Sequence, residues 1–151
     1  MTLKGFYKLE KKKKILKIKW QRLVSEGETC PRCGSTEKEL DKGILILKQS
    51  LAPFGVEIEL DKERLYLSES EKDPLRSNRI WISSLSIEDY IKGKVGQNPC
   101  CGVCGPYECR TVEIEGRTYE TIPSEIIVKA GLFAASQLVD ARGVCFGGNR
   151  Y

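Results

Sequence analysis

Apolar and polar residues alternate in the first part of the chain. Leu16, Ile18 and Trp20 alternate with Lys17 and Lys19. A period of two is typical of a strand that buries one face. The polar stretch 25–28 breaks the alternation, so we expect the strand to end there and Trp20 to lie in the core.

A helical spacing follows after residue 35. Apolar residues recur at intervals of four and three, at Leu40, Ile44, Leu47, Leu51 and Phe54. This spacing places them on one face of a helix. Thr36 and Glu39 have the spacing of a capping box at its start, and Gly55 is placed to end it. A second strand is expected at 56–60, which completes a βαβ unit.

The remaining elements are shorter. We expect a charged connection at 65–74, a buried strand at 80–82 that includes Trp81, a brief helix from Ser86, a hairpin at 112–120 and an amphipathic helix from Pro123 to Leu138. The segment 93–109 is rich in Gly, Pro and Cys and is predicted to be a loop. The order is βαβ followed by ββα, so the predicted fold is an α/β sheet with helices packed on it and a Cys-rich loop inserted.

The composition narrows the possible chemistry. The chain has 151 residues, seven cysteines and no histidine. This length supplies one domain with one core. Ser-His-Asp and Cys-His catalysis and most zinc hydrolase sites are excluded because they require an imidazole. Any chemistry must use thiols, carboxylates or lysines.

The net charge of +4 arises from the first 22 residues, because the rest of the chain is slightly acidic. Residues 1–22 hold nine Lys or Arg side chains and one acidic residue, Glu10, whereas 23–151 hold 16 basic and 20 acidic side chains. We therefore predict a basic leader at 1–14, a domain at 15–139 and a tail at 140–151. The lysine run in the leader can contact RNA or anionic lipid, although a solvated charge run is the simpler interpretation. The high Lys and Glu content also suits a thermophile.

No stretch has the roughly 18 apolar residues of a membrane span. The N-terminus also lacks the apolar core of a signal peptide. We therefore expect a cytoplasmic protein. In that compartment, cysteines are more often catalytic or metal-binding than part of a disulfide framework.

The first cysteine cluster is Cys30-Pro31-Arg32-Cys33, between a predicted strand and a predicted helix. The amides and dipole of a helix N-terminus stabilise a thiolate and lower the thiol pKa from about 8.5 to roughly 3.5–7.5. In this interpretation Cys30 is the nucleophile, Cys33 resolves the mixed disulfide and Arg32 favours the thiolate. Because Gly34 follows Cys33, the segment also resembles a zinc knuckle, and inert structural thiols are a third possibility.

The second cluster holds four thiols within ten residues, Cys100, Cys101, Cys104 and Cys109. This density is typical of a thiolate site for zinc or an iron–sulfur cluster. A thiol relay and a set of structural disulfides are alternatives. A further alternative is one zinc site shared by Cys30, Cys33, Cys101 and Cys104, although residues 34–100 separate the two halves.

Three blocks together resemble a known family. They are Cys30–Thr36, Ser77–Ile82 and Cys100–Gly105, and the resemblance extends over about residues 20–138. The family consists of small prokaryotic thioredoxin-like proteins with a domain of unknown function. The resemblance implies a thioredoxin-like sheet with helices packed on it and implies no specific activity. Asn78 stands where thioredoxins carry a cis-proline, and because a cis bond before a residue other than proline costs about 2.5–4 kcal/mol, we expect a trans peptide there.

We therefore expect a thiol–disulfide or related soft-atom redox protein that uses Cys30 and Cys33, with the second cluster as a metal site or thiol relay. Its partners are then protein or small-molecule disulfides. The alternative is a non-catalytic zinc- or metalloid-binding protein with thiolate ligands from both clusters. We expect no membrane partner, and a nucleic-acid partner is the least favoured alternative. An RNA-associated module that uses the lysine leader is the third hypothesis, and it predicts strongly salt-dependent binding.

Overall fold

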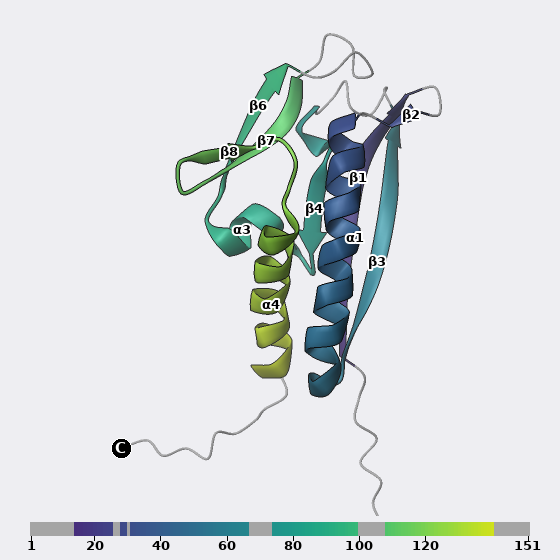
Figure 1. The fold of residues 1–151 in the computed structure, drawn as a ribbon, viewed down its shortest axis with the longest axis vertical. Coiled ribbons are helices and arrows are strands. Elements are labelled where there is room, and N and C mark those ends of the chain that lie inside the picture. The colour runs from purple at the N-terminus through teal and green to yellow at the C-terminus, as the bar shows by residue number, and fades with distance from the viewer. Residues whose placement is uncertain (1–13, 26–27, 30, 67–73, 100–107, 141–151) are drawn as a thin grey trace, which may run out of the picture.

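The computed structural model describes residues 14–25, 28–29, 31–66, 74–99 and 108–140. Two sheets and two long helices make up this part of the chain (Figure 1). The predicted leader and most of the predicted tail lie outside the described residues. Within the described part, no helix is long and apolar enough to cross a membrane.

The main sheet is mixed and is built around the first strand. Strand β1 (Lys14–Ser25) pairs in parallel with β3 (Val56–Tyr66) and antiparallel with β4 (Arg79–Ile82). The short strands β2 (Glu28–Thr29) and β5 (Leu85–Ser86) pair antiparallel with β1 and β4. The predicted βαβ unit is present, with β1 and β3 as its parallel strands.

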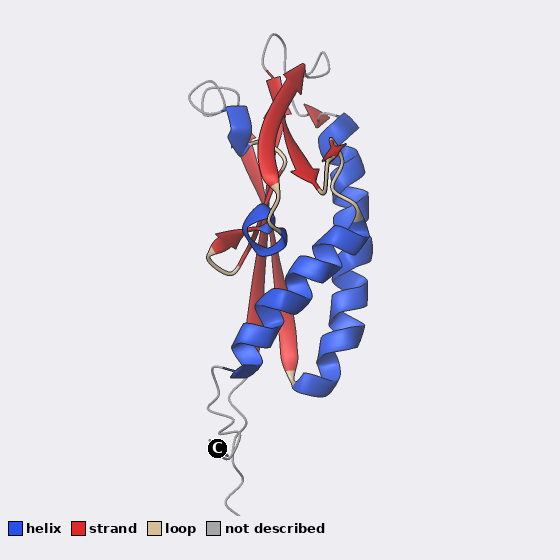
Figure 2. Cartoon of the chain, turned by 90° about the vertical axis from the view of Figure 1, so that its left-hand side faces the viewer, coloured by secondary structure: helices blue, strands red, loops and turns tan. Residues whose placement is uncertain are grey.

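The helices cover one face of this sheet. Helix α1 (Pro31–Leu51) continues into a 3-10 turn, η1 (Ala52–Phe54), and α4 (Ser124–Asp140) packs against α1. Figure 2 shows the two long helices together on one side of the long strands. The prediction of an α/β sheet with helices packed on it is confirmed, and the sheet is mixed.

The core lies between the helices and the covered face of the sheet. Leu16, Ile18 and Trp20 of β1 are almost completely buried, as the alternation predicts. Trp81 is only half-buried and lies in a surface depression, so its predicted place in the core was wrong. Its neighbours in β4, Ile80 and Ile82, point to the core instead, because successive side chains of a strand alternate between faces.

A second, three-stranded antiparallel sheet follows the short helix α3 (Ile87–Ile91). It consists of β6 (Lys94–Pro99), β7 (Glu108–Ile114) and β8 (Arg117–Tyr119). A buried ion pair between Glu88 of α3 and Arg110 of β7 helps to join this sheet to the rest of the molecule.

The loop prediction for residues 93–109 was partly wrong. Residues 94–99 and 108–109 form strands, although 93–109 was predicted to be a loop. Strand β6 could not be predicted from its composition, because it is an exposed edge strand without apolar alternation. It is held by backbone pairing with β7. The predicted hairpin at 112–120 does form, but it belongs to the second sheet. Strand β3 also continues to Tyr66, past the predicted end at residue 60, since its polar side chains lie on the open face of the sheet or against α1.

The start of α1 also differs from the prediction. The helix begins at Pro31, five residues before Thr36, in keeping with the preference of proline for the first helical position. Thr36 and Glu39 instead hold the chain that enters α4. Thr36 Oγ1 accepts a hydrogen bond from the Ile122 amide at 3.3 Å, and Glu39 Oε2 accepts one from the Ser124 amide at 2.9 Å.

Candidate redox site at the start of helix α1

Helix α1 begins immediately after Cys30 and contains Cys33 in its first turn. Cys30 itself lies outside the described residues. The first amides of a helix have no partner within the helix, and the helix dipole is positive at this end. A thiolate near this end is therefore stabilised, as the sequence predicts for the dithiol. Gly34 is part of the same helical turn, and its φ is not among the positive values of the described glycines.

Cys33 is completely buried and lies against the segment that precedes β4. Its Sγ is 3.6 Å from the Ser77 Oγ. The Ser77 Oγ also accepts a hydrogen bond from the Leu23 amide at 3.2 Å. Because this bond uses an oxygen lone pair, the hydroxyl hydrogen of Ser77 is available to donate to sulfur. Ser77 can therefore stabilise the thiolate form of Cys33.

Asn78 follows Ser77, and the resemblance to thioredoxins predicted it to stand in place of their cis-proline. No cis peptide bond occurs among the described residues, so the expected trans peptide is confirmed there. Asn78 instead has a positive φ of 58°. Its Oδ1 accepts a hydrogen bond from Trp20 Nε1 at 3.3 Å, and its Nδ2 donates to the Glu120 carbonyl at 3.2 Å. These bonds compensate for a left-handed backbone conformation that most side chains avoid.

Arg32 connects the start of α1 to the second sheet. Its Nη1 donates to Asn98 Oδ1 at 2.7 Å, and its Nη2 donates to the Pro99 carbonyl at 3.4 Å. The guanidinium also pairs with Glu120 Oε1 at 3.3 Å, and the same oxygen accepts a hydrogen bond from Asn98 Nδ2 at 2.7 Å. Only 11% of the Arg32 side chain is exposed. The sequence predicted that the positive charge of Arg32 favours the thiolate form of the dithiol. In the fold, this charge is paired with the Glu120 carboxylate.

Asn98 and Glu120 were not predicted from the sequence. Asn98 lies 66 residues from Arg32 along the chain, and neither residue belongs to a motif. Only the folding of the second sheet brings them to Arg32, so no local pattern could have identified them.

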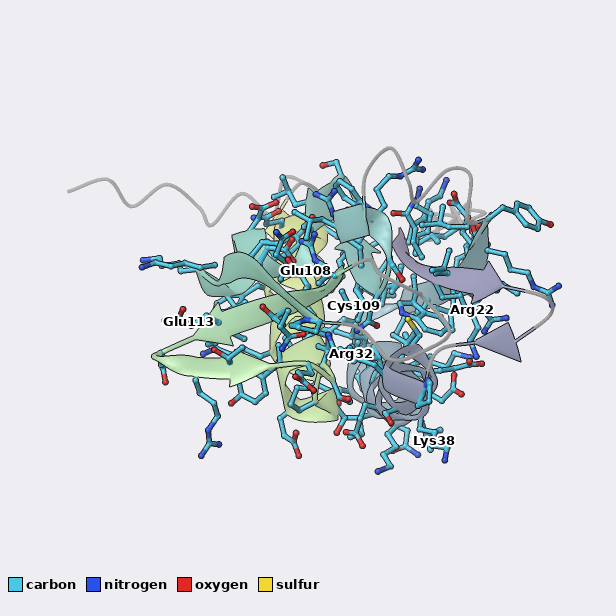
Figure 3. The ribbon with its side chains drawn as sticks, turned by 90° about the horizontal axis from the view of Figure 1, so that it is seen from above. Arg22, Arg32, Lys38, Glu108, Cys109 and Glu113 are labelled. Atoms are coloured by element: carbon cyan, nitrogen blue, oxygen red, sulfur yellow. The ribbon has the colours of Figure 1, made fainter. Side chains whose placement is uncertain are left out.

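In the sequence, the second cysteine cluster follows directly after β6. Its first three members, Cys100, Cys101 and Cys104, lie outside the described residues. Cys109 is the second residue of β7, is 2% exposed and is disulfide-bonded. It pairs across the ladder with Asn98, the residue that Arg32 contacts. Figure 3, a view from above, places Arg32 and Cys109 near each other.

The structure thus brings Cys33 and Cys109, from the two clusters, into one hydrophobic core. Among the described residues, no group of three or more Cys, Asp or Glu side chains is arranged to hold a metal ion. Three of the four predicted metal ligands are not among those residues, so the prediction of a metal site stays a prediction.

The charged groups beside the first turns of α1 are paired. Glu37 binds Arg22 at 2.8 Å and Lys62 at 3.0 Å. Burial raises the pKa of Glu37, but the hydrogen bonds and positive charges of Lys62 and Arg22 outweigh it and lower the pKa overall. Burial likewise lowers the pKa of Lys62, while hydrogen bonds to Glu37 and Asp41 raise it overall. These ion pairs tie α1 to β1 and β3.

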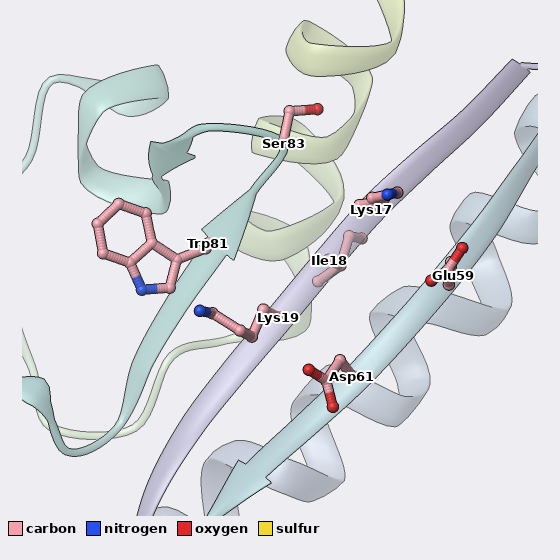
Figure 4. A pocket seen from close by; sticks show the side chains of 7 residues that line it. All are labelled: Lys17, Ile18, Lys19, Glu59, Asp61, Trp81 and Ser83. Carbon is pink, nitrogen blue, oxygen red and sulfur yellow. The ribbon is translucent and has the colours of Figure 1, made fainter.

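A shallow depression of about 370 Å³ lies on the open face of the main sheet (Figure 4). It is lined by lysines, acidic residues and an aromatic ring from three strands and the turn after β4: Lys17, Ile18, Lys19, Glu59, Asp61, Trp81 and Ser83. Arg79 stacks on the Trp81 ring at 3.9 Å. None of these described lining residues is a cysteine, and none of them belongs to the start of α1.

Comparison with known proteins places most of the chain in one family. Residues 16–131 match the family described as "Domain of unknown function (DUF2703)". A protein of Archaeoglobus fulgidus called "Uncharacterized protein" is 43% identical over 112 residues, which cover 74% of this chain and 82% of that protein. No solved structure matches the chain. The chain therefore belongs to the DUF2703 family.

Proposed function

We propose that this protein is a thiol–disulfide redox protein whose active dithiol is Cys30 and Cys33. The observation that carries the proposal is the place of Cys33, buried in the first turn of a long helix that follows the central strand of the sheet. A dithiol at a helix N-terminus has the electrostatic support that keeps a thiolate reactive near neutral pH.

The arrangement of the elements supports a thioredoxin-like interpretation of the main sheet. Strands β1 and β3 are parallel, with α1 between them in sequence, and β4 and β5 continue the sheet antiparallel on the other side of β1. Helix α4 then packs beside α1. The segment Ser77-Asn78 enters β4 next to Cys33, as expected from the resemblance.

The backbone after Cys33 argues against a zinc knuckle. A knuckle uses the glycine after its second cysteine for a tight turn. Here Gly34 continues the helix, and the glycines with positive φ in the described part of the chain are Gly55 and Gly116. The redox interpretation of the first cluster is therefore the better supported one.

The disulfide at Cys109 bears on the second cluster. A metal ligand must be a thiolate, so a zinc or iron–sulfur site that includes Cys109 requires prior reduction of its disulfide. A disulfide at Cys109 fits a thiol relay or a structural disulfide better than a metal ligand at this position.

The proposed reaction is an exchange of two electrons between the dithiol and a disulfide. The Cys30 thiolate attacks one sulfur of the substrate, breaks its S–S bond and releases the other sulfur as a thiolate that takes up a proton. Cys33 then loses its proton and attacks the sulfur of Cys30 in the mixed disulfide. The products are a Cys30–Cys33 disulfide and two substrate thiols, so the electrons and protons of the dithiol pass to the substrate.

Turnover with a small disulfide substrate tests the proposal. The reduced wild-type protein, Cys30→Ser, Cys33→Ser and the control Cys145→Ser are compared in the reduction of a chromogenic aromatic disulfide. We expect Cys30→Ser to lose activity, Cys33→Ser to form a mixed disulfide without further turnover, and the control to match the wild type. Equal activity of Cys30→Ser and the wild type would refute the proposal.

A further inference from the structure

We propose that the open face of the main sheet binds the same face of a second copy of this chain, so that the protein forms a two-fold symmetric dimer. The charge pattern of the face identifies this partner, because the pattern is complementary to itself. The inference goes beyond the proposed redox function and does not depend on it, since α1 lies on the opposite face of the sheet (Figure 2).

The open face is the uncovered side of a parallel strand pair. In the described part of the chain, α1 and α4 lie together on one side of β1 and β3. All-parallel sheets are covered on both faces, whereas in this mixed sheet the described helices cover only one face of the parallel pair. The other side has room for a further layer, and two sheets that pack face to face lie about 10 Å apart.

The charges on this face are sorted by strand. Two basic side chains, Lys17 and Lys19, come from β1, and two acidic ones, Glu59 and Asp61, come from β3 (Figure 4). The register of the two strands places Lys17 level with Glu59 and Lys19 level with Asp61. The face therefore carries a basic column directly beside an acidic column.

Three of these charges are exposed and are not neutralised within the described part of the chain. Lys19 pairs with Glu63 at 3.3 Å. Lys17, Glu59 and Asp61 form no ion pair with another described residue, and all three are exposed. They are therefore available to a partner whose charges lie in the matching arrangement.

A two-fold axis that runs parallel to the strands, between β1 and β3, supplies that arrangement. Rotation about this axis places the basic column of one copy over the acidic column of the other and preserves the height along the strands. Lys17 then faces Glu59 of the second copy, and the contact occurs twice, as in every isologous interface. The strand directions also stay within the angle of about 30° that is usual for packed sheets. An axis perpendicular to the strands would instead place columns of like charge over each other.

The face also offers apolar atoms for the contact. Ile15 lies at the end of the basic column and is 41% exposed, and the aliphatic stems of lysines pack against apolar surface while their ammonium groups remain in water. The contact is nevertheless largely polar. We therefore expect the dimer to weaken with added salt, because charges are screened over about 10 Å at 0.1 M ionic strength.

Sedimentation velocity of the full chain, at low ionic strength and over a concentration series, tests the dimer. A phosphine reductant excludes dimers that are linked by disulfides. We expect the wild type to dimerise. Lys17→Glu and Glu59→Lys each place like charges opposite each other at both symmetric contacts, so each should raise the dissociation constant roughly a hundredfold or more. Lys129→Glu makes the same change of charge on the exposed side of α4 and should dimerise as the wild type does.

A mixing experiment separates contacts between copies from contacts within one chain, because Lys17 and Glu59 are also neighbours on adjacent strands. An equimolar mixture of Lys17→Glu and Glu59→Lys restores opposite charges at both contacts between copies, whereas the charges within each chain stay as they are in the single variants. We expect a dimer with one copy of each variant, identified by native mass spectrometry after one variant is labelled with 15N.

Three results would overturn the inference: a monomeric wild-type protein, a Lys17→Glu protein that dimerises as tightly as the wild type, or a mixture that stays monomeric. If the wild type is monomeric and Lys17→Glu lowers the free energy of unfolding while Lys129→Glu does not, a segment of the same chain covers this face instead.

Discussion

At the scale of single residues, the proposed redox function depends on the contacts around Cys33. The thiol is buried beside one hydroxyl, and Ser77 has its oxygen already engaged by the Leu23 amide. A buried thiolate needs a hydrogen-bond donor, since burial alone raises a thiol pKa. Among the described residues, the Ser77 hydroxyl is placed to supply one.

Substitution of Ser77 tests this role. Ser77→Ala removes the donor, so the Cys33 thiolate is less stable and resolves the mixed disulfide more slowly. A hydrogen bond to a charged group contributes about 1.5–3 kcal/mol, so we expect the mixed disulfide with a small substrate to live roughly tenfold longer or more. Stopped-flow measurement of its decay as a function of pH checks this, and the midpoint of the decay profile should move to higher pH.

The matched control is Ser83→Ala, which alters an exposed serine in the depression on the open face of the sheet. It should leave the decay unchanged. A Ser77→Ala protein that unfolds more easily but resolves the mixed disulfide at the wild-type rate would assign Ser77 a structural role only.

At the scale of elements, α1 decides between the two interpretations of the first cluster. A helix that begins at Pro31 places Cys33 where the dipole and the first amides act on it, whereas a knuckle needs a glycine turn. A Cβ atom added to Gly34 would have no neighbouring atom within 4 Å. A Cβ atom added to Gly131 would lie only 2.5 Å from Cδ1 of Leu47. Gly131 therefore allows α4 to approach α1 closely, whereas Gly34 has no such packing role.

Alanine at Gly34 should consequently stabilise the protein. Glycine costs about 0.5–1 kcal/mol relative to alanine inside a helix, so Gly34→Ala should raise the free energy of unfolding by up to about that amount and preserve disulfide exchange. Urea denaturation measures the change. Gly131→Ala is the comparison, and crowding against Leu47 should offset its gain in helix propensity. Loss of folding in Gly34→Ala would instead favour the knuckle.

The elements themselves could be predicted to different degrees. The buried strand β1 and the helices α1 and α4 follow from apolar periodicity, because each has one face in the core. Strand β6 could not be predicted in this way, since its side chains are largely exposed and backbone pairing with β7 holds it. The start of α1 was predicted too late because Thr36 and Glu39 resemble a capping box but hold the entry to α4 instead.

At the scale of the whole molecule, the second sheet brings members of the two cysteine clusters, Cys33 and Cys109, into one hydrophobic core. The sequence separates the two clusters by more than 60 residues and gives no sign that they meet. In the fold, β6 ends and β7 begins beside the start of α1, and Arg32 binds the end of β6. The position of Cys33 was predictable from local spacing, whereas its relation to Cys109 depends on contacts between distant segments.

The reactivity of Cys30 tests the central claim most directly. Alkylation of the fully reduced protein by iodoacetamide, followed from pH 4 to pH 10 on the tryptic peptide 23–32, reports the thiolate fraction of Cys30. The account predicts a midpoint well below the ordinary thiol value of about 8.5, because the start of α1 stabilises the thiolate. A midpoint at the ordinary value, equal to that of the same peptide in urea, would contradict the claim that this dithiol is redox-active.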